Sequence, residues 1–151
     1  MRASLPIFAV LALAACAPES GDPPAGGTRD GSEAAAPSGF QVEIVSPADG
    51  DTVDGPTLTV TLNVTGGRIV PAGDTTSGTG HHHLYLDADL TPASQPVPSI
   101  PGSVVHMGDG SSTYSFTEVE PGEHRVIAVV ADGVHVPLQP WVVDTVHVVV
   151  R

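Results

Sequence analysis

The sequence of residues 40–151 predicts an all-β fold, an antiparallel sandwich, on three observations. Apolar and polar residues alternate with a period of two, which is typical of strands with one buried face. Turn-forming residues recur at intervals of roughly 8–12 residues. No window of helical length has an apolar period near 3.6. Together these observations favour an immunoglobulin-like antiparallel β-sandwich of about seven strands.

Four segments carry the strand pattern most clearly. In residues 57–64 leucine and valine alternate with threonine and asparagine, and in residues 40–44 apolar side chains alternate with glutamine and glutamate. Residues 125–131 are apolar on both faces, so we expect a central strand that is covered on both sides. Residues 141–150 form the last strand. We expect Trp141 to be partly buried at one end of the sandwich, because the proline before it cannot donate a ladder hydrogen bond.

The start of the chain has the pattern of a processing signal. Arg2 precedes an apolar run that is too short for a comfortable transmembrane helix, and small residues then lead to Cys16. The tetrapeptide from Leu13 to Cys16 resembles a bacterial lipobox, which implies that residues 1–15 are a signal peptide and that Cys16 is lipidated. Ala17, which follows the cysteine, resembles the pattern of lipoproteins sent to the outer membrane. An ordinary secretory signal is the alternative.

Residues 16–39 predict a disordered tether between this anchor and the domain. Alanine, proline, glycine and serine dominate the segment, which cannot bury enough apolar surface to offset the entropy of ordering. Residues 40–151 suit one domain with its own core. Because Cys16 is the only cysteine, the domain has neither a disulfide nor a thiolate ligand. We therefore expect a lipid-anchored protein of the bacterial cell envelope, held at the outer membrane and facing the periplasm or the cell surface.

The charge of the chain limits its partners. The formal net charge is −12 and there is no lysine. Removal of Arg2 with the signal peptide makes the mature chain more acidic still. Such a chain lacks the basic surface that nucleic acid or anionic lipid head groups require, whereas metal cations or basic envelope proteins are easier to accommodate. Solubility alone, or a saline habitat, explains the acidity equally well.

Three consecutive histidines, His81, His82 and His83, open a segment with a strand-like pattern. On a strand His81 and His83 point to the same side with Cα atoms roughly 6.5–7 Å apart, so both imidazoles can reach one metal ion. His82 points to the other side with the following leucines, and we expect a structural role for it. Because imidazoles are costly to desolvate, the triplet either forms a site or lies on an exposed rim.

The remaining histidines are more scattered. His106 lies in a glycine-containing segment that reads as a loop, and His135 follows the central strand just before Pro137. Loops of a sandwich gather at its two ends, so these imidazoles can meet the triplet, but the sequence does not fix whether they do. We expect His124, which follows a Pro-Gly turn, to bond to the backbone as the corner tyrosine of immunoglobulin domains does; a ligand role is the alternative. His147 alternates with valines and is expected at the surface.

Four blocks of sequence, GTGHHHLYLD, HMGDG, PGEHRV and GVHVP, resemble in this order the DUF4399 family, a bacterial domain of unassigned function. The resemblance covers about residues 50–150. Two positions depart from the family pattern: Leu138 stands where the last histidine of a block is usual, and residues 111–113 replace a Gln-Thr-Glu. If the family binds a metal through that last histidine, this chain has lost one ligand. The family histidines correspond here to His81, His82, His83, His106, His124 and His135.

Two functions are consistent with these residues. The first is a metal-binding envelope lipoprotein, because neutral imidazole suits Cu(II) and Zn(II), with copper bound most strongly. Met107 can assist with Cu(I), and Asp87 can orient an imidazole by a hydrogen bond. The candidate ligands are His81, His83, His106 and His135.

The second function is an immunoglobulin-like interaction or envelope-structure module without a cofactor, in which the histidines bond to loop carbonyls and fix the turns. Enzymatic activity is the weakest option, because the sequence has no G-x-S-x-G, H-E-x-x-H or paired-carboxylate arrangement, although an open metal site can be catalytic. The aspartates of residues 87–89 suggest either calcium or, more simply, a turn that ends a strand.

Overall fold

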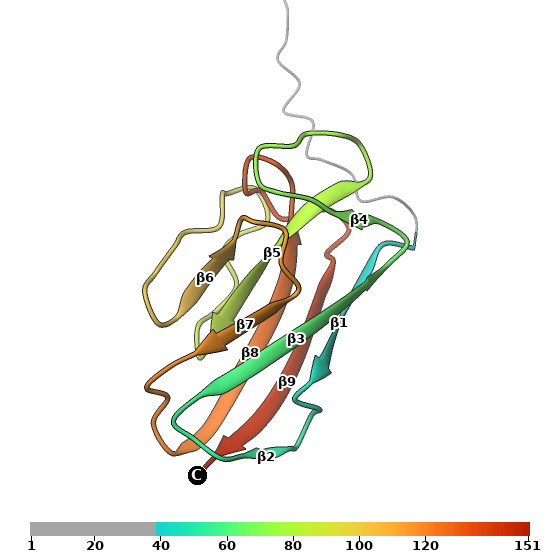
Figure 1. Cartoon of the computed structure of the whole chain (residues 1–151). Helices are drawn as coiled ribbons and strands as arrows, with labels where there is room; N and C mark the ends of the chain where they lie inside the picture. Colours follow the sequence, from blue (N-terminus) through green and yellow to red (C-terminus); the bar gives the residue numbers. More distant parts are fainter. Residues whose placement is uncertain (1–38) are drawn as a thin grey trace, which may run out of the picture. The chain divides into compact units, whose positions relative to one another are not determined.

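The computed structural model describes residues 39–151. The expected signal peptide, the lipidated Cys16 and the tether up to residue 38 lie outside these residues. All regular elements of the described part are β-strands, and it contains no helix that could span a membrane (Figure 1). The prediction of an all-β fold is therefore confirmed.

Nine strands form two layers that face each other (Figure 1). One sheet has the order β1-β3-β7, and the other has the order β2-β9-β8-β5-β4 with β6 also paired to β5. The two shortest strands, β2 and β4, make the only parallel pairings in the described residues. Seven strands have four or more residues, in agreement with the predicted number. The strands are β1 (Gln41–Ser46), β2 (Thr52–Val53), β3 (Leu58–Thr65), β4 (Arg68–Ile69), β5 (Thr79–Leu86), β6 (Val104–Met107), β7 (Thr113–Phe116), β8 (Gly122–Ala131) and β9 (Val143–Val150).

The main hydrophobic core lies between the two sheets. Alternate residues of β3 point into it, as the alternation of leucine and valine with threonine predicted, and β8 runs through the middle of the larger sheet between β9 and β5. Strands β1, β3 and β9 therefore bury the apolar half of a period-two pattern, whereas β5 and the second half of β8 are buried on both faces. From β5, β6 and β8 this core includes Leu84, Leu86, Met107, Val126, Ala128 and Val130.

A second, smaller core covers the outer face of the larger sheet. Its members on β5, β6 and β8 have the opposite side-chain direction from the residues of the main core, and Val97 of the segment 87–103 packs against them. This segment therefore acts as a lid over the outer face of β5 at Tyr85, while Leu84 and Leu86 face the main core, and every residue of β5 is buried. The second core consists of Tyr85, Val97, Val104, Ile127 and Val129.

Two predictions concern side chains at the surface. Trp141 lies just before β9 and, at 37% exposure, is one of the exposed large apolar side chains, so it is less buried than predicted. His147 on β9 points to solvent between two buried valines.

Candidate metal centre

The histidine triplet begins the buried strand β5. The exposed fractions of His81, His82 and His83 are 1%, 1% and 0%, so the alternative of an exposed rim is wrong. The physical reason is that β6 and β8 flank β5 on either side, that His82 faces the main core, and that the rings of His106 and His135 pack against those of His81 and His83. In register, His81 lies opposite Ala131, and the strand period then directs His81 and His83 to the outer face of the sheet.

His106 lies on strand β6, where the sequence interpretation had placed a loop. Its partner in the antiparallel register is His83, directly opposite. Residues directly opposite in such a pair have side chains on the same face, so the register itself brings the two imidazoles together. Gly108 follows in the chain, and a Cβ at that position would overlap the His106 ring. The glycine therefore leaves room for the His106 ring.

His135 comes from the loop between β8 and β9. Its backbone has a φ of 73°, in the left-handed region. The side chain is half-buried, and its ring reaches the same cluster as those from the strands.

These four imidazoles, from two strands and one loop, form a compact cluster. Each pair of ring centroids is separated by between 4.6 and 5.7 Å. The Nε2 atoms of His81 and His83 are 3.0 Å apart, and those of His106 and His135 are 3.2 Å apart. Potential ligand nitrogens of His81, His83 and His106 all lie within 4.8 Å of one another. The structure thus brings together all four candidates that the sequence proposed.

The cluster has a buried side and an open side. His81 and His83 form its floor, whereas His106 is exposed. Two hydrogen bonds join the loops around the open side: Ala72 N donates to Gly108 O at 3.0 Å, and Gly73 N donates to Gly133 O at 3.0 Å. The segment between β4 and β5 is therefore bonded to the segments that follow His106 and precede His135, without contributing an imidazole.

Burial keeps the strand imidazoles neutral. Burial, and then the charges of the facing imidazoles, lower the pKa of His81 to about 4 and the pKa of His83 to about 2. For His106 the buried part of the ring, and then the imidazole of His135, lower the pKa, while the nearby Asp109 acts in the opposite direction. A neutral imidazole has a free lone pair, which is the form that binds a metal.

One ring nitrogen of each buried histidine in the cluster, His81 and His83, makes no hydrogen bond among the described residues. In both residues this nitrogen is Nδ1. The purely structural interpretation requires hydrogen bonds from the clustered imidazoles to backbone carbonyl groups. Within residues 39–151 none of the four clustered imidazoles makes such a bond. The bonds that do occur join one imidazole to another.

His82 faces the main core. It pairs with Met107 on one side and Val130 on the other, and both of these residues belong to that core. Burial lowers the pKa of His82 to about 4, and its Nδ1 atom is buried without a partner among the described residues. The expected orientation of His82, opposite to its two neighbours, is correct.

Met107 and Asp87, which the sequence suggested as an additional Cu(I) ligand and as a hydrogen-bond partner of an imidazole, do not contact the cluster in these roles. Met107 has the opposite side-chain direction from His106 and is buried in the main core, so it is not available to a Cu(I) ion at the cluster. Asp87 comes at the far end of β5, where both of its carboxylate oxygens are engaged by His124 and Arg125. Leu138, at the position of a usual family histidine, is also in the main core, so its presence removes no side chain from this cluster.

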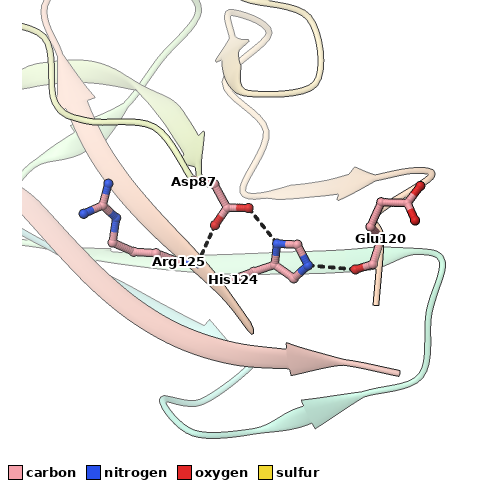
Figure 2. A network of polar contacts seen from close by, with 4 residues as sticks. All are labelled: Asp87, Glu120, His124 and Arg125. Carbon is pink, nitrogen blue, oxygen red and sulfur yellow. Dashed lines mark hydrogen bonds and ion pairs between the residues drawn. The ribbon is translucent and has the colours of Figure 1, made fainter. Parts of the chain in front are cut away.

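His124 forms a separate polar network at the start of β8 (Figure 2). Its Nε2 atom lies 2.8 Å from the carbonyl oxygen of Glu120, which is the backbone bond expected of a corner residue. Its Nδ1 atom also lies 2.6 Å from Oδ2 of Asp87, whose Oδ1 accepts the backbone N–H of Arg125. The guanidinium of Arg125 donates to Oδ1 of Asp89, so this pair of aspartates ends the strand and anchors the next turn.

The sequence interpretation missed the carboxylates that shape the loops around the cluster. Asp74, Asp109 and Asp132 each accept, through Oδ1, the backbone N–H two residues further on, at 2.9 Å in all three. The sequence predicts turns at these positions, because aspartate beside glycine is a recognised turn signal, but it does not assign the hydrogen bonds of the carboxylates. Their position around one cluster could not be read from the sequence.

An all-β sandwich with clustered histidines is the class of protein that these observations define. The chain belongs to the DUF4399 family, whose description is a domain of unknown function, and the match covers residues 60–151. No curated protein matches the chain.

Solved structures give weaker similarities. An engineered protein from a structural genomics consortium has a TM-score of 0.44 and 18% identity, over 77% of this chain and 21% of that one. The endo-β-1,4-mannanase from Thermotoga petrophila has a TM-score of 0.44 and 17% identity, over 74% and 20% of the two chains. A lytic polysaccharide monooxygenase from Jonesia denitrificans has a TM-score of 0.38 and 13% identity, over 70% and 60%. The chain thus spans about a fifth of the first two proteins.

Proposed function

We propose that this protein binds a transition-metal ion, Cu(II) or Zn(II), through its imidazole cluster. The observation that carries the proposal is the convergence of four histidine rings from separate parts of the chain, with every pair of centroids within 5.7 Å. An all-nitrogen set without thiolate suits copper and zinc better than calcium or magnesium, which prefer oxygen. The ligands are His81, His83, His106 and His135.

The cost of the cluster supports a binding function over a purely structural one. A buried polar atom without a hydrogen-bond partner costs about 1–3 kcal/mol, and the floor contains two such atoms, Nδ1 of His81 and of His83. An apolar pair at these positions would avoid that cost. A metal bound at the Nε2 atoms would leave each Nδ1–H without a partner, and His82 has the same unpartnered Nδ1 atom outside the cluster, so only the metal–nitrogen bonds themselves would offset this cost.

The surroundings of the cluster suit a cation that arrives from solvent. His106 is exposed, so the ion has a path to the buried pair. The chain is strongly acidic, which raises the local concentration of cations, and Asp109 lies close enough to His106 to influence its charge. Because the floor imidazoles are already neutral at pH 7, binding requires no proton release from them.

We further propose that the protein is a lipoprotein of the bacterial cell envelope, anchored through Cys16. The support is the lipobox-like sequence that ends at Cys16, and the composition of residues 16–39, which suits a tether. The metal site would then be held at the outer membrane. An envelope protein that recognises the domain is the partner consistent with this location.

Calorimetric titration tests the metal proposal. The full chain, expressed without a histidine tag, purified in detergent and stripped of metal with a chelator, is titrated with Cu(II) and Zn(II) at pH 7.5. We expect one ion per chain and a higher melting temperature in the presence of free ion, since a ligand of the native state stabilises it. Replacement of both His81 and His83 by alanine should abolish binding and the thermal shift.

Two further variants separate ligand loss from misfolding. His106→Ala with His135→Ala removes the two imidazoles on the open side, where little core packing is lost, and should also abolish tight binding. His147→Ala changes an exposed histidine on β9 and should bind like the wild type. If all of these proteins bind equally weakly, the cluster is structural and the chain is an interaction module instead.

A further inference from the structure

The backbone of His135 has a conformation that needs external support. Its φ of 73° lies in the left-handed region, which non-glycine residues seldom adopt. Such a residue costs on the order of 1–3 kcal/mol and persists only where the surrounding structure fixes it. His135 is the one candidate ligand that comes from a loop, so the accuracy of its ring position depends on that support.

Asp132 supplies most of the support. Its carboxylate Oδ1 accepts the backbone N–H groups of Val134 and Val136, both at 2.9 Å, and its carbonyl oxygen accepts the N–H of His135 at 3.0 Å. Its own N–H donates to Val136 O at 2.9 Å. One residue therefore receives the amide hydrogens of the three residues centred on His135, and this fixes the turn.

The turn is also held from both sides. Val97, in the lid of residues 87–103, donates its N–H to the carbonyl oxygen of His135 at 2.9 Å. On the other side Gly73 N donates to Gly133 O, and a Cβ at Gly133 would overlap the carbonyl oxygen of Asp74. The loop therefore lies in close contact with two neighbouring segments, and its backbone has little freedom.

This arrangement differs from the usual way of orienting a ligand histidine. A metal-binding imidazole commonly donates its second ring N–H to a carboxylate or carbonyl group. In residues 39–151 the second nitrogens of His81 and His83 have no such partner, and the only hydrogen bond of the His135 ring is to His106. The ring of His135 is thus oriented through its backbone.

We propose that Asp132 is the positioning residue of the metal site: it holds the strained turn that directs His135 toward His106. The inference rests on the proposed metal-binding function. Asp132 contacts no ligand ring, and its effect on the ion is exerted through the backbone of residues 134–136. A ligand that is positioned before the ion arrives lowers the entropic cost of binding.

A pair of substitutions at Asp132 tests this role. Asp132→Ala removes the acceptor of two backbone amides, whereas Asp132→Asn keeps a side-chain oxygen that can accept the same hydrogen bonds. In titrations of the full chain with Cu(II) and Zn(II), we expect Asp132→Ala to weaken binding about 10- to 100-fold, the range typical for residues that orient ligands. Asp132→Asn should restore most of the affinity. Pulsed electron paramagnetic resonance of the Cu(II) protein should show one imidazole nitrogen fewer in the alanine variant.

A double-mutant cycle with His135 distinguishes positioning from general destabilisation. In a His135→Ala background, Asp132→Ala should cause no further loss of affinity, because the ligand it positions is already absent. Asp51→Ala, which removes a comparable carboxylate cap on Ala48 N in the β1–β2 turn, is the matched control and should bind like the wild type.

Three results would overturn the proposed role of Asp132. Two of them leave the proposed metal-binding function standing, and the third contradicts that function as well. If Asp132→Ala binds as tightly as the wild type, or if its effect adds in full to that of His135→Ala, Asp132 does not act through His135, while the metal site itself stands. If the wild-type protein binds neither ion, the positioning role falls together with the proposed function.

Discussion

The imidazole of His124 lies between two oxygen acceptors: Nδ1 is 2.6 Å from Oδ2 of Asp87, and Nε2 is 2.8 Å from the carbonyl oxygen of Glu120 (Figure 2). Neither a carboxylate nor a carbonyl group can donate a hydrogen, so both ring nitrogens must do so. A neutral imidazole has only one N–H. His124 is therefore an imidazolium ion in this structure, and it joins the end of β5 to the start of β8.

We predict that His124→Gln destabilises the protein most at acidic to neutral pH. Burial acts to lower the pKa of His124, but the hydrogen bonds to Asp87 and to Glu120 outweigh it, so the folded-state pKa is raised. The stabilisation is then fully present below the unfolded-state value of about 6.5 and is lost as pH rises through the folded-state pKa. At pH 6 the loss should be about 1–2 kcal/mol, after allowance for the exposed Asp87 side chain.

Thermal unfolding of the wild type and the variant between pH 6 and pH 9 checks this expectation. The gap between the two melting temperatures should narrow as pH increases. Asp87→Asn provides a control, because it removes the carboxylate charge and should move the NMR titration midpoint of His124 downward. A gap that stays constant across the range would mean that His124 is not charged.

The metal-free protein should lose stability in acid because of the buried triplet. The folded-state pKa values of His81 and His82 are about 4 and that of His83 about 2, all below the unfolded value of 6.5. Their neutral forms therefore stabilise the fold above pH 6.5, and this contribution is lost as pH falls through 6.5 toward 4. Each such histidine contributes up to about 1.4 kcal/mol per pH unit.

Melting temperatures of chelator-treated protein between pH 7.5 and pH 4.5 measure this loss. The exposed His147 offers a control, since His147→Ala should leave the slope unchanged. A wild-type protein whose melting temperature does not change over this interval would show that the triplet is open to water.

We predict that His82 can be replaced by leucine without loss of metal binding. Its ring contacts the main core, and Nδ1 is buried without a partner among the described residues, so a leucine of similar size removes a polar group that is costly to bury. His82→Leu should raise the melting temperature and reduce the acid sensitivity. His82→Ala should instead cost about 2 kcal/mol or more through the cavity it leaves. A leucine variant less stable than the wild type would reveal a polar role for this ring.

Lipidation at Cys16 is tested in a Gram-negative host fed with a labelled fatty acid. The wild-type protein should incorporate the label and partition into detergent, because an acylated cysteine anchors the chain. Cys16→Ser should do neither. An unlabelled wild-type protein in the soluble fraction would mean that the first residues are an ordinary secretory signal.

The sequence predicts those features of the fold and of the candidate site that depend on residues close to one another in the chain. The period-two pattern predicted the sandwich, and the same period correctly separated His82 from its neighbours. The sequence predicts a loop around His106 in place of the observed short strand β6, because four residues beside two glycines give a weak strand signal. Its pairing with β5 depends on the packing of Val104 and Met107 against residues distant in the sequence.

The partners of the polar residues were harder to predict. Asp87 has the period of His81 and His83, which suggested a bond to that cluster, but its own φ of 53° turns the chain at that point and directs it to His124. The role of Asp132 depends on a turn conformation and on contacts with Gly73 and Val97, from two other segments. Such relationships arise from the closed fold, and no local pattern encodes them.

The direct pairing of His83 with His106 ties the composition of the imidazole cluster to strand alignment. A shift of β6 by one residue would exchange its two faces, directing Met107 toward the cluster and His106 into the apolar interior. The four-imidazole cluster therefore exists only in one alignment of an edge strand of four residues. An ion that bridged the two strands would favour that alignment over the alternatives.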